Sequence, residues 1–295
     1  MRLPATGLPS SRVLVVLATS LAFALVMTSC WSAPMIYAQM PRIAAAKIEE
    51  AFDLAHSQKR QVRTELNRML DWHRREQIPA LIQWLDRAEE HLRSSNGFDA
   101  TEVSALVDDA WTFRDALYNY VYDHAYGFLA SLSKEQIDHF IAAQKERNKE
   151  RYEDLEGGQD NYTAIVSRKW RKRLETWIGA LNETQVQRIG AAAAQSFVDK
   201  TSERDDVLRL QQEFATLLRQ LPPSEPDDFG STLWKMTPSS RGTPRHQRML
   251  GLLTEIAVSL TADQKTHLGS EIATWRGRLL GITPTPVAPK VLANP

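Results

Sequence analysis

The side chains that could do chemistry in this chain are scattered. Its single cysteine is Cys30, and its histidines lie at positions 56, 73, 91, 124, 139, 246 and 267. Zinc sites gather Cys, His and carboxylate ligands at close spacing, and these histidines show no such spacing. The metallopeptidase pattern His-Glu-x-x-His, the Gly-x-Ser-x-Gly turn and a glycine-rich phosphate loop are absent from the sequence. We therefore predict no metal, no cofactor and no enzymatic activity.

Residues 71–79, DWHRREQIP, are the first candidate for a binding site. Trp72, His73 and Arg74 could form a recognition patch on the surface. Alternatively, Trp72 packs in the core, while His73 and Arg74 satisfy helix ends or pair with acids beside Pro79. We favour the structural interpretation, which predicts that replacing both His73 and Arg74 with alanine costs stability.

Glu175 and Trp177 are the second part of the candidate recognition patch, and the basic segment RKWRKR (168–173) precedes them. Basic side chains near a membrane could bind lipid phosphates. However, Trp170 shares one helical stripe with Trp177, so the basic side chains would line the opposite, solvated face. We favour the solvated-face interpretation.

Cys30 is the residue with the clearest predicted chemistry, which is acylation of its thiol. An apolar run from 13 to 27, about 15 residues long, follows Arg2 and Arg12, which is typical of a signal peptide covering residues 1–29. The run is short for a membrane span, which needs roughly 20 apolar residues. A free thiol in a secreted chain needs an explanation, and acylation is the simplest one.

The residues before Cys30 resemble a bacterial lipobox, in which the signal is cut before a cysteine that carries diacylglycerol. Met27 and Ser29 stand where leucine and glycine or alanine are usual. A plain secretory signal with a chance cysteine is the alternative. Trp31 stands where aspartate would indicate retention in the inner membrane, so the resemblance implies the outer membrane. The acyl anchor would hold the chain on the membrane without spanning it.

The composition is that of an ordinary globular protein, and its charge balance gives no reason to expect nucleic-acid binding. The chain has 36 basic and 36 acidic residues, and removal of Arg2 and Arg12 leaves 34 against 36. Nucleic-acid-binding domains are usually basic. The hydrophobic fraction of 43% suffices for one large core or two small ones.

Apolar residues recur at helical spacing, whereas the alternation typical of strands is rare. Two clear stripes run through residues 81–92 and 170–181. Asp99 and Glu102 are spaced as a capping box before a long helix. The sequence therefore predicts an all-α, multi-helix bundle.

The Pro-, Ser- and Gly-rich segment 222–243 is long for a loop, and such loops are often functional or disordered. Its apolar residues either dock onto the helices, which we favour, or offer a site for a partner. The predicted organisation is a signal peptide (1–29), an anchored linker (30–36), one helical half (37–157), a second helical half (158–281) and a disordered tail (282–295).

One five-residue pattern, which runs from Leu to Gln, begins several helical segments. It occurs as LSKEQ (132–136), LNETQ (181–185) and LTADQ (260–264), with a weaker copy, LAHSQ (54–58). Its second residue can cap a helix, and its glutamine can reach back to the backbone N–H of the cap. The residues in these roles are Ser133 with Gln136, Asn182 with Gln185, Thr261 with Gln264, and Gln58 without a capping partner.

The spacing of the copies is regular, because Leu54 and Leu181 are 127 residues apart and Leu132 and Leu260 are 128 apart. A tandem duplication would explain this spacing. Repeated use of a good helix cap would explain it equally well.

The lipobox, LAHSQ, WHRREQIP, LSKEQ, RLETWIGALNETQ and LTADQ, in this order, resemble the blocks of a proteobacterial lipoprotein family of unknown function. Trp72, His73 and Arg74 carry the resemblance in one block, and Glu175 and Trp177 in another. The pattern L-T-x-x-Q is also similar to a hallmark of small helical periplasmic chaperones, which hold unfolded clients on a helical surface.

These inferences predict an outer-membrane lipoprotein on the periplasmic face, anchored by its acyl group at Cys30. Its expected role is to bind an unfolded polypeptide or an envelope component, without nucleic acid. The alternative is a structural or assembly scaffold for a specific envelope protein.

Overall fold

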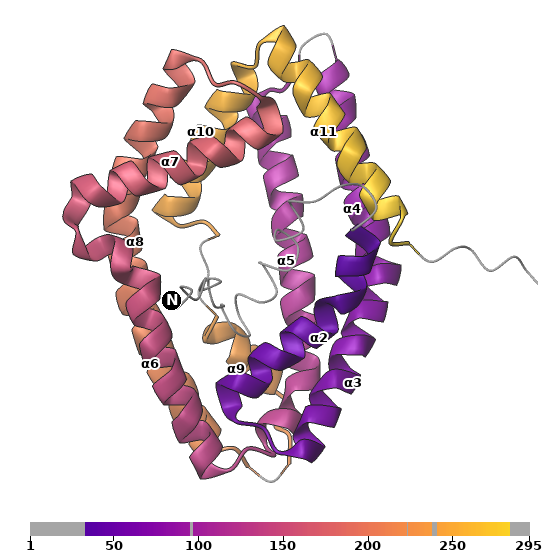
Figure 1. Cartoon of the computed structure of the whole chain (residues 1–295), viewed down its shortest axis with the longest axis vertical. Coiled ribbons are helices and arrows are strands. Elements are labelled where there is room, and N and C mark those ends of the chain that lie inside the picture. Colours follow the sequence, from indigo (N-terminus) through magenta and orange to yellow (C-terminus); the bar gives the residue numbers. More distant parts are fainter. Residues whose placement is uncertain (1–32, 95–96, 223, 238–240, 284–295) are drawn as a thin grey trace, which may run out of the picture.

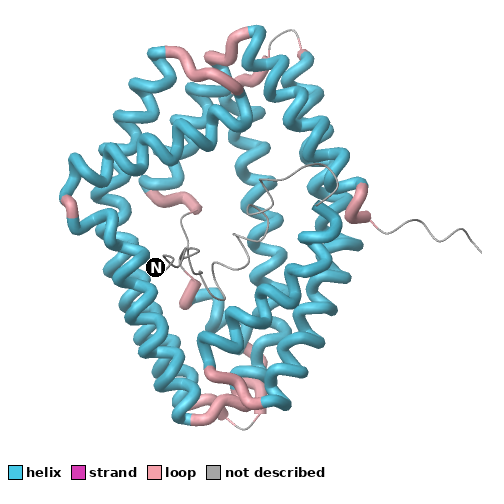
Figure 2. Tube along the Cα trace, in the orientation of Figure 1, coloured by secondary structure: helices cyan, strands magenta, loops and turns pink. Residues whose placement is uncertain are grey.

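A computed structural model describes residues 33–94, 97–222, 224–237 and 241–283, and helices joined by short turns make up these segments (Figure 1, Figure 2). No strand occurs in the described ranges, which confirms the all-α prediction. Within them, no helix combines the length and apolar character that a membrane crossing requires. In chain order the elements are α2 (Ala33–Phe52), α3 (His56–Trp72), the π-helical turn η1 (His73–Gln77), α4 (Ile78–Arg93), α5 (Ala100–Leu129), α6 (Lys134–Glu156), α7 (Gly158–Ile178), α8 (Glu183–Arg219), α9 (Phe229–Lys235), α10 (Pro244–Val258) and α11 (Ala262–Leu280).

Local sequence rules set several helix ends. Asp99 caps α5 by accepting the backbone N–H of Glu102 at 2.8 Å, and the Glu102 carboxylate accepts the N–H of Asp99 at 2.8 Å. The break between α6 and α7 falls at Gly157 and Gly158, where Gly158 adopts φ +78°. Such a φ strains any residue with a Cβ atom, so glycine suits this position.

Three segments differ from the expected organisation. Helix α2 begins at Ala33, inside the stretch expected to be a linker, because the helix buries Tyr37 and Met40. The segment 222–243 contains helix α9, which buries Phe229 and Leu233. Ile282 is buried against Tyr37 and its neighbours, although the tail was expected to begin there. In each case, apolar contacts with distant parts of the chain order a segment that local sequence left undefined.

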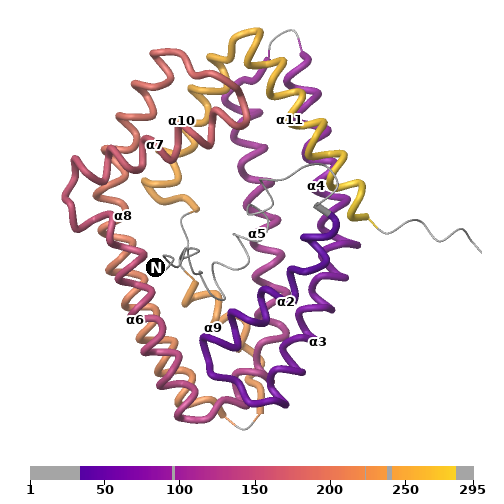
Figure 3. The backbone as a smooth tube through the Cα atoms, viewed as in Figure 1, coloured from indigo at the N-terminus to yellow at the C-terminus, as the bar shows by residue number. Residues whose placement is uncertain are grey.

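The helices form an elongated frame (Figure 3). Helices α6 and α8 pack along one side of it, while α3 and α4 follow each other along the other side (Figure 1). Helix α5 lies between these sides and packs against α3, α9 and α10. Helix α11 closes the frame by packing on α4 and α7.

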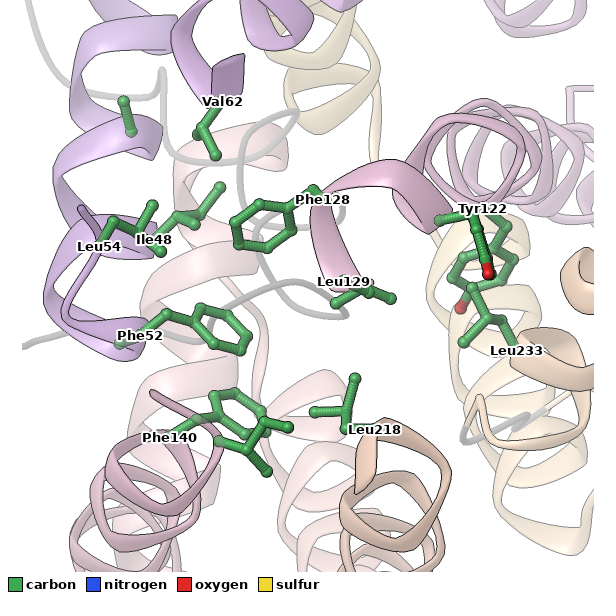
Figure 4. Close-up of a cluster of buried hydrophobic side chains, with 14 of the residues drawn as sticks. Ile48, Phe52, Leu54, Val62, Tyr122, Phe128, Leu129, Phe140, Leu218 and Leu233 are labelled. Carbon is green, nitrogen blue, oxygen red and sulfur yellow. The ribbon is translucent and has the colours of Figure 1, made fainter. Parts of the chain in front are cut away.

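The first core lies at the end of the frame where α2, α3, α5 and α6 meet (Figure 4). Phe52 stacks on Phe140 with ring centroids 4.4 Å apart and meets the edge of Phe128 at 5.5 Å. Leu218 of α8 and Leu233 of α9 complete this core. The first half of the chain therefore buries its core with residues from the second half.

The second core lies among α4, α7, α8, α10 and α11. The residues of the two predicted stripes pack here, with Leu81 in a small adjoining cluster, so these stripes are buried faces as expected. Trp177 of α7 stacks on Trp275 of α11 with centroids 6.0 Å apart. Since Leu85, Ala88 and Leu92 come from α4, the second half likewise depends on the first.

A charged network joins α6, α8 and α10. The Glu203 carboxylate accepts from Arg151 at 2.7 Å and from Lys200 at 2.8 Å, and it also pairs with Arg245. Burial raises the pKa of Glu203, but the charges of Lys200, Arg245 and Arg151 outweigh burial and hold the pKa at about 2. The carboxylate thus stays ionised and links three helices.

Candidate functional site

The glutamines of the repeated pattern bind each other across the fold. Nε2 of Gln58 donates to Oε1 of Gln136 at 3.0 Å, and Nε2 of Gln136 donates to Oε1 of Gln58 at 2.7 Å. Each Oε1 also accepts the backbone N–H at the start of its own helix, from Ala55 at 2.9 Å and from Ser133 at 3.0 Å. The predicted capping role is present, but it is only half of what these side chains do.

The remaining amide hydrogens of this pair bind the turns of the neighbouring helix. Gln58 donates to the carbonyl oxygen of Ser131 at 2.8 Å, and Gln136 donates to that of Asp53 at 3.0 Å. Each glutamine therefore uses two donors and an acceptor oxygen that takes two bonds, which is the full capacity of a side-chain amide. We call this arrangement a glutamine clamp. Glutamate could cap the helix but could not form the clamp, because a carboxylate has no N–H.

A second glutamine clamp joins the starts of α8 and α11. Gln185 donates to Gln264 at 3.0 Å, and Gln264 donates back at 2.8 Å. Their Oε1 atoms accept the N–H groups of Asn182 and Thr261, both at 3.1 Å. Gln264 also donates to the carbonyl oxygen of Ala180 at 2.7 Å. Gln185 is 0% exposed, so this clamp lies inside the protein.

Further bonds match between the two ends of the frame. Nε2 of His139 donates to the carbonyl oxygen of Glu50 at 3.0 Å, and Nε2 of His267 donates to that of Thr176 at 3.2 Å. The reversal before each clamp uses a residue with positive φ, Asp53 in the first half (φ +47°) and Gly179 in the second (φ +75°). A helix cap alone does not demand these extra bonds, so they favour duplication over repeated use of a cap.

The segment Trp72–His73–Arg74 lies at the π-helical turn η1, where the backbone N–H of Ile78 bonds to the carbonyl oxygen of His73. Pro79 follows directly, and proline clashes with the carbonyl four residues earlier in a regular helix. The wider π-turn accommodates it, so α3 and α4 run on from each other instead of separating. Turns of this kind occur often at functional sites, which makes the segment a candidate.

Side-chain contacts at the π-turn are internal. The hydroxyl of Tyr37 lies 2.8 Å from Nδ1 of His73. Burial lowers the pKa of His73 to about 4, so the imidazole is neutral at pH 7 where it meets the tyrosine hydroxyl. The Arg74 guanidinium lies 5.6 Å from the centroid of the Tyr37 ring, and Trp72 stacks on Tyr120 at 4.6 Å. The structural interpretation places Trp72 in the core and pairs Arg74 with an acid, here Asp71 at 3.8 Å, whereas His73 meets Tyr37 instead of a helix end or an acid.

The two parts of the candidate recognition patch lie at different cores. Trp72 packs against the first core, whereas Trp177 packs against the second, and Glu175 is exposed on α7. The basic segment 168–173 follows the solvated-face interpretation, since Trp170 packs into the core and Lys169 pairs with Asp154 at 2.7 Å.

A cleft of about 330 Å³ lies between α5 and the docked segment that carries α9. The segment is held by Trp234, whose Nε1 donates to Oδ1 of Asn119 at 2.5 Å, and by Thr237, which bonds to the Tyr122 hydroxyl. Burial raises the pKa of Tyr122 to about 12, so its hydroxyl stays protonated. Phe229 anchors the same segment in the first core. Residues 224–237 of this segment therefore dock onto the helices, as the favoured interpretation expects.

The cleft is acidic. Its lining includes the exposed carboxylates of Asp123, Glu225 and Asp227 beside the Trp234 ring. None of the three carboxylates has an ion-pair partner among the residues that the structure describes. A larger open depression of about 550 Å³ lies along α8, but its charged residues Arg209 and Glu213 pair with each other at 2.8 Å. The cleft thus offers unpaired negative charge next to an aromatic ring.

Sequence reasoning missed this cleft, because its walls are far apart in the chain. The sequence shows three acidic residues at 225, 227 and 228, but no local pattern indicates that they face Asp123 of α5. In the described part of the chain, no group of three or more His, Cys, Asp or Glu side chains could hold a metal ion. Cys30, the predicted lipidation site, lies outside the described residues.

Comparison with known proteins gives one match. A family described as a family of unknown function (DUF6279) matches residues 50–233, which include η1, the first glutamine clamp and Gln185 of the second. Neither the curated proteins nor the solved structures that were searched contain a match.

Proposed function

The chain belongs to the family of unknown function DUF6279, and on that premise we propose that it is a non-catalytic binding protein of the bacterial envelope. In this proposal it is a proteobacterial lipoprotein, anchored at Cys30 to the outer membrane and facing the periplasm. Its ligand is a cationic segment of an envelope polypeptide.

The acidic cleft between α5 and α9 carries this proposal. Lysine or arginine side chains of a polypeptide would meet Asp123, Glu225 and Asp227, which lack partners within the described residues. The Trp234 ring beside them can hold the apolar stem or the charged head of such a side chain. The volume of about 330 Å³ is at the lower end of the range for ligand pockets, so it suits one or two side chains of a longer partner.

Cross-linking in the native envelope tests the proposal. A photo-reactive residue at the exposed Ser231 on the cleft should capture a polypeptide that mass spectrometry identifies. Neutralising Asp123→Asn, Glu225→Gln and Asp227→Asn together should weaken binding of the captured partner by ~10-fold, because each exposed charge contributes up to about 1 kcal/mol. Added salt should reduce the difference.

A matched control uses the exposed carboxylates of Glu153 and Glu156 on α6. The double substitution Glu153→Gln and Glu156→Gln removes similar charge away from the cleft and should leave binding unchanged. Equal weakening in both variants would refute recognition by the cleft.

A structural or assembly scaffold for a fixed envelope protein is the second candidate function. The glutamine clamps favour it, because the glutamines of all four motif copies are engaged in internal bonds, which fix helix ends. An aggregation assay with a denatured client distinguishes the candidates. A client-binding protein delays aggregation at equal or lower molar ratios, whereas a scaffold has no effect.

The anchor has its own test. Replacing Cys30→Ala should release the protein from the membrane fraction. Retention of this variant in the membrane would refute lipid anchoring at Cys30.

A further inference from the structure

Helix α2 has an exposed face that is apolar and carries no acidic residue before Glu49 and Glu50 at its C-terminal end. Its outward side chains include Met35 (71% exposed), Ile36 (37%) and Ile43 (48%). Arg42 and Lys47 are the only charged residues of α2 before Glu49. The ion pairs of α2 lie toward its C-terminal end, at Lys47, Glu49 and Glu50.

The exposed residues of this face recur at helical spacing. Met35, Gln39, Arg42, Ile43 and Ala46 follow the three- and four-residue steps that place side chains on one side of a helix, and all five are exposed. The opposite side buries another set of residues, among them Tyr37, Met40, Ala44, Ala45 and Ile48. Helix α2 is therefore buried on one side and presents apolar side chains with a positive charge on the other.

The predicted anchor lies very close to this face. Two residues, Trp31 and Ser32, separate Cys30 from Ala33, the first residue of α2, and the three steps from Cys30 to Ala33 span at most about 10 Å. The acylated end of the chain would thus hold the first turn of α2 at the headgroups of the membrane. No longer spacer is available to lift the body away.

We infer that the exposed face of α2 lies on the lipid bilayer and orients the protein on the membrane. This inference rests on the proposed function, because it requires the acyl anchor at Cys30. Helices at a membrane surface place apolar side chains among the acyl chains and basic side chains among anionic headgroups. Met35, Ile36 and Ile43 supply the first kind, and Arg42 supplies the second, while Lys47 at the edge of the face pairs with Glu50 at 3.2 Å.

Spin labelling of the acylated full-length mature protein tests the inference. Since Cys30 is the only cysteine of the chain and its thiol carries the lipid, Met35→Cys or Ile43→Cys introduces the only free thiol. The protein is placed on vesicles of phosphatidylethanolamine and phosphatidylglycerol. Accessibility of the nitroxide to oxygen, which concentrates in lipid, is compared with accessibility to an aqueous nickel chelate.

Val198→Cys on α8 provides the matched control, because Val198 is 68% exposed. Labels at positions 35 and 43 should lose nickel accessibility when vesicles are added, while the label at 198 keeps it. A label at position 35 that stays accessible to nickel in the acylated, vesicle-bound protein would overturn this inference but not the proposed function. Labels at 35 and 43 that are shielded from both oxygen and nickel would also overturn it, because they would show that a protein covers the face.

The proposed function fails in a different way. If the thiol of the wild-type mature protein reacts with a maleimide, Cys30 is not acylated, and the anchor and the membrane-bound face of α2 are both refuted. Vesicle binding by a Met35→Glu, Ile43→Glu variant gives a second measurement. This variant should dissociate from vesicles at least ~10-fold faster than wild type, because two large apolar side chains are lost from the bilayer.

Discussion

The amides of Gln185 and Gln264 donate to each other, Nε2 to Oε1, at 3.0 and 2.8 Å, and so join the starts of α8 and α11. Neither residue is near the other in the chain, and both are buried. The bond therefore fixes the relative position of two helices, in addition to capping each of them.

Replacing Gln185→Glu should lower the free energy of unfolding by about 2–4 kcal/mol at pH 7. Glutamate retains the acceptor for the Asn182 N–H but donates nothing to Gln264, and its charge is buried. Burial would raise the pKa of the new carboxyl, so the loss should be largest above that pKa and should shrink as the pH falls. Denaturant unfolding at pH 7 and pH 5 measures both effects.

Glu102→Gln is the control for the clamp. Glu102 occupies the same capping position on α5, where its carboxylate accepts the N–H of Asp99 without any glutamine partner, and its other oxygen lies 2.8 Å from Nδ1 of His91 on the surface. This change should alter stability by less than about 1 kcal/mol. Equal costs for Glu102→Gln and Gln185→Glu would show that capping alone explains the motif.

The neutral, half-buried His73 should make stability fall as the pH is lowered. Its pKa is lowered to about 4 in the folded protein, whereas an unfolded histidine titrates near 6.5. The unfolded chain therefore takes up the proton first, and stability is lost between about pH 6.5 and 4, by up to about 3 kcal/mol. Thermal unfolding of wild type and His73→Gln over this range measures the difference. A constant difference between them across the range would contradict the assignment.

Glu203→Gln should destabilise the protein by about 2–3 kcal/mol at pH 7, because Lys200, Arg151 and Arg245 lose their shared carboxylate. The folded pKa of Glu203 is held at about 2, below its unfolded value. The contribution of the wild-type carboxylate is thus complete above about pH 4.5 and is lost as the pH falls toward 2. Urea unfolding at pH 7 and pH 3 should show a smaller gap between the proteins at the lower pH.

Gly179→Ala should cost about 1–3 kcal/mol. Gly179 has φ +75° and ψ −155°, a region that residues with a Cβ atom rarely adopt. An added Cβ would lie 3.4 Å from the His267 ring, so the cost comes from backbone strain and not from collision. As a control, Gly190→Ala within α8 meets no atom within 4 Å and should stabilise the helix by up to about 1 kcal/mol.

Phe229→Ala should cost about 3–5 kcal/mol and speed proteolysis within 222–243. Phe229 is 2% exposed and meets the edge of the Tyr126 ring at 5.1 Å, so its loss leaves a cavity beneath the docked segment. Ser231→Ala, on the exposed side of the same helix, should change neither stability nor cleavage. Unchanged cleavage after Phe229→Ala would contradict the role of this anchor.

Local sequence patterns predicted the features that short-range interactions determine, namely helix starts and buried helix faces. The caps at Ser133, Asn182 and Thr261, the box at Asp99 and the buried stripes of α4 and α7 all depend on residues within one or two turns. The weakest copy of the motif, at Gln58, forms the same glutamine clamp as the others. The clamp requires the glutamine side chain and does not require a capping side chain at Ala55.

The candidate sites depended on contacts that sequence spacing does not contain. No local rule pairs Gln58 with Gln136, although one signal was present: every copy carries glutamine where a simple capping box would accept glutamate equally well. The acidic cleft needs Asp123 and Glu225 on one surface, and only the docking of α9 brings them there. Helix α2 begins inside the expected linker, and its order depends on the burial of Tyr37, which meets His73, and of Met40.

The crossed packing of the two halves has a consequence for how such a chain could arise. Helix α6 of the first half packs on α8 of the second, and α11 of the second packs on α4 of the first, while each core takes side chains from both. A half-length chain would expose these surfaces alone, but two copies would cover them by the same exchange. The two halves thus exchange helices as the subunits of a swapped dimer do, and Gly157 and Gly158 lie between them.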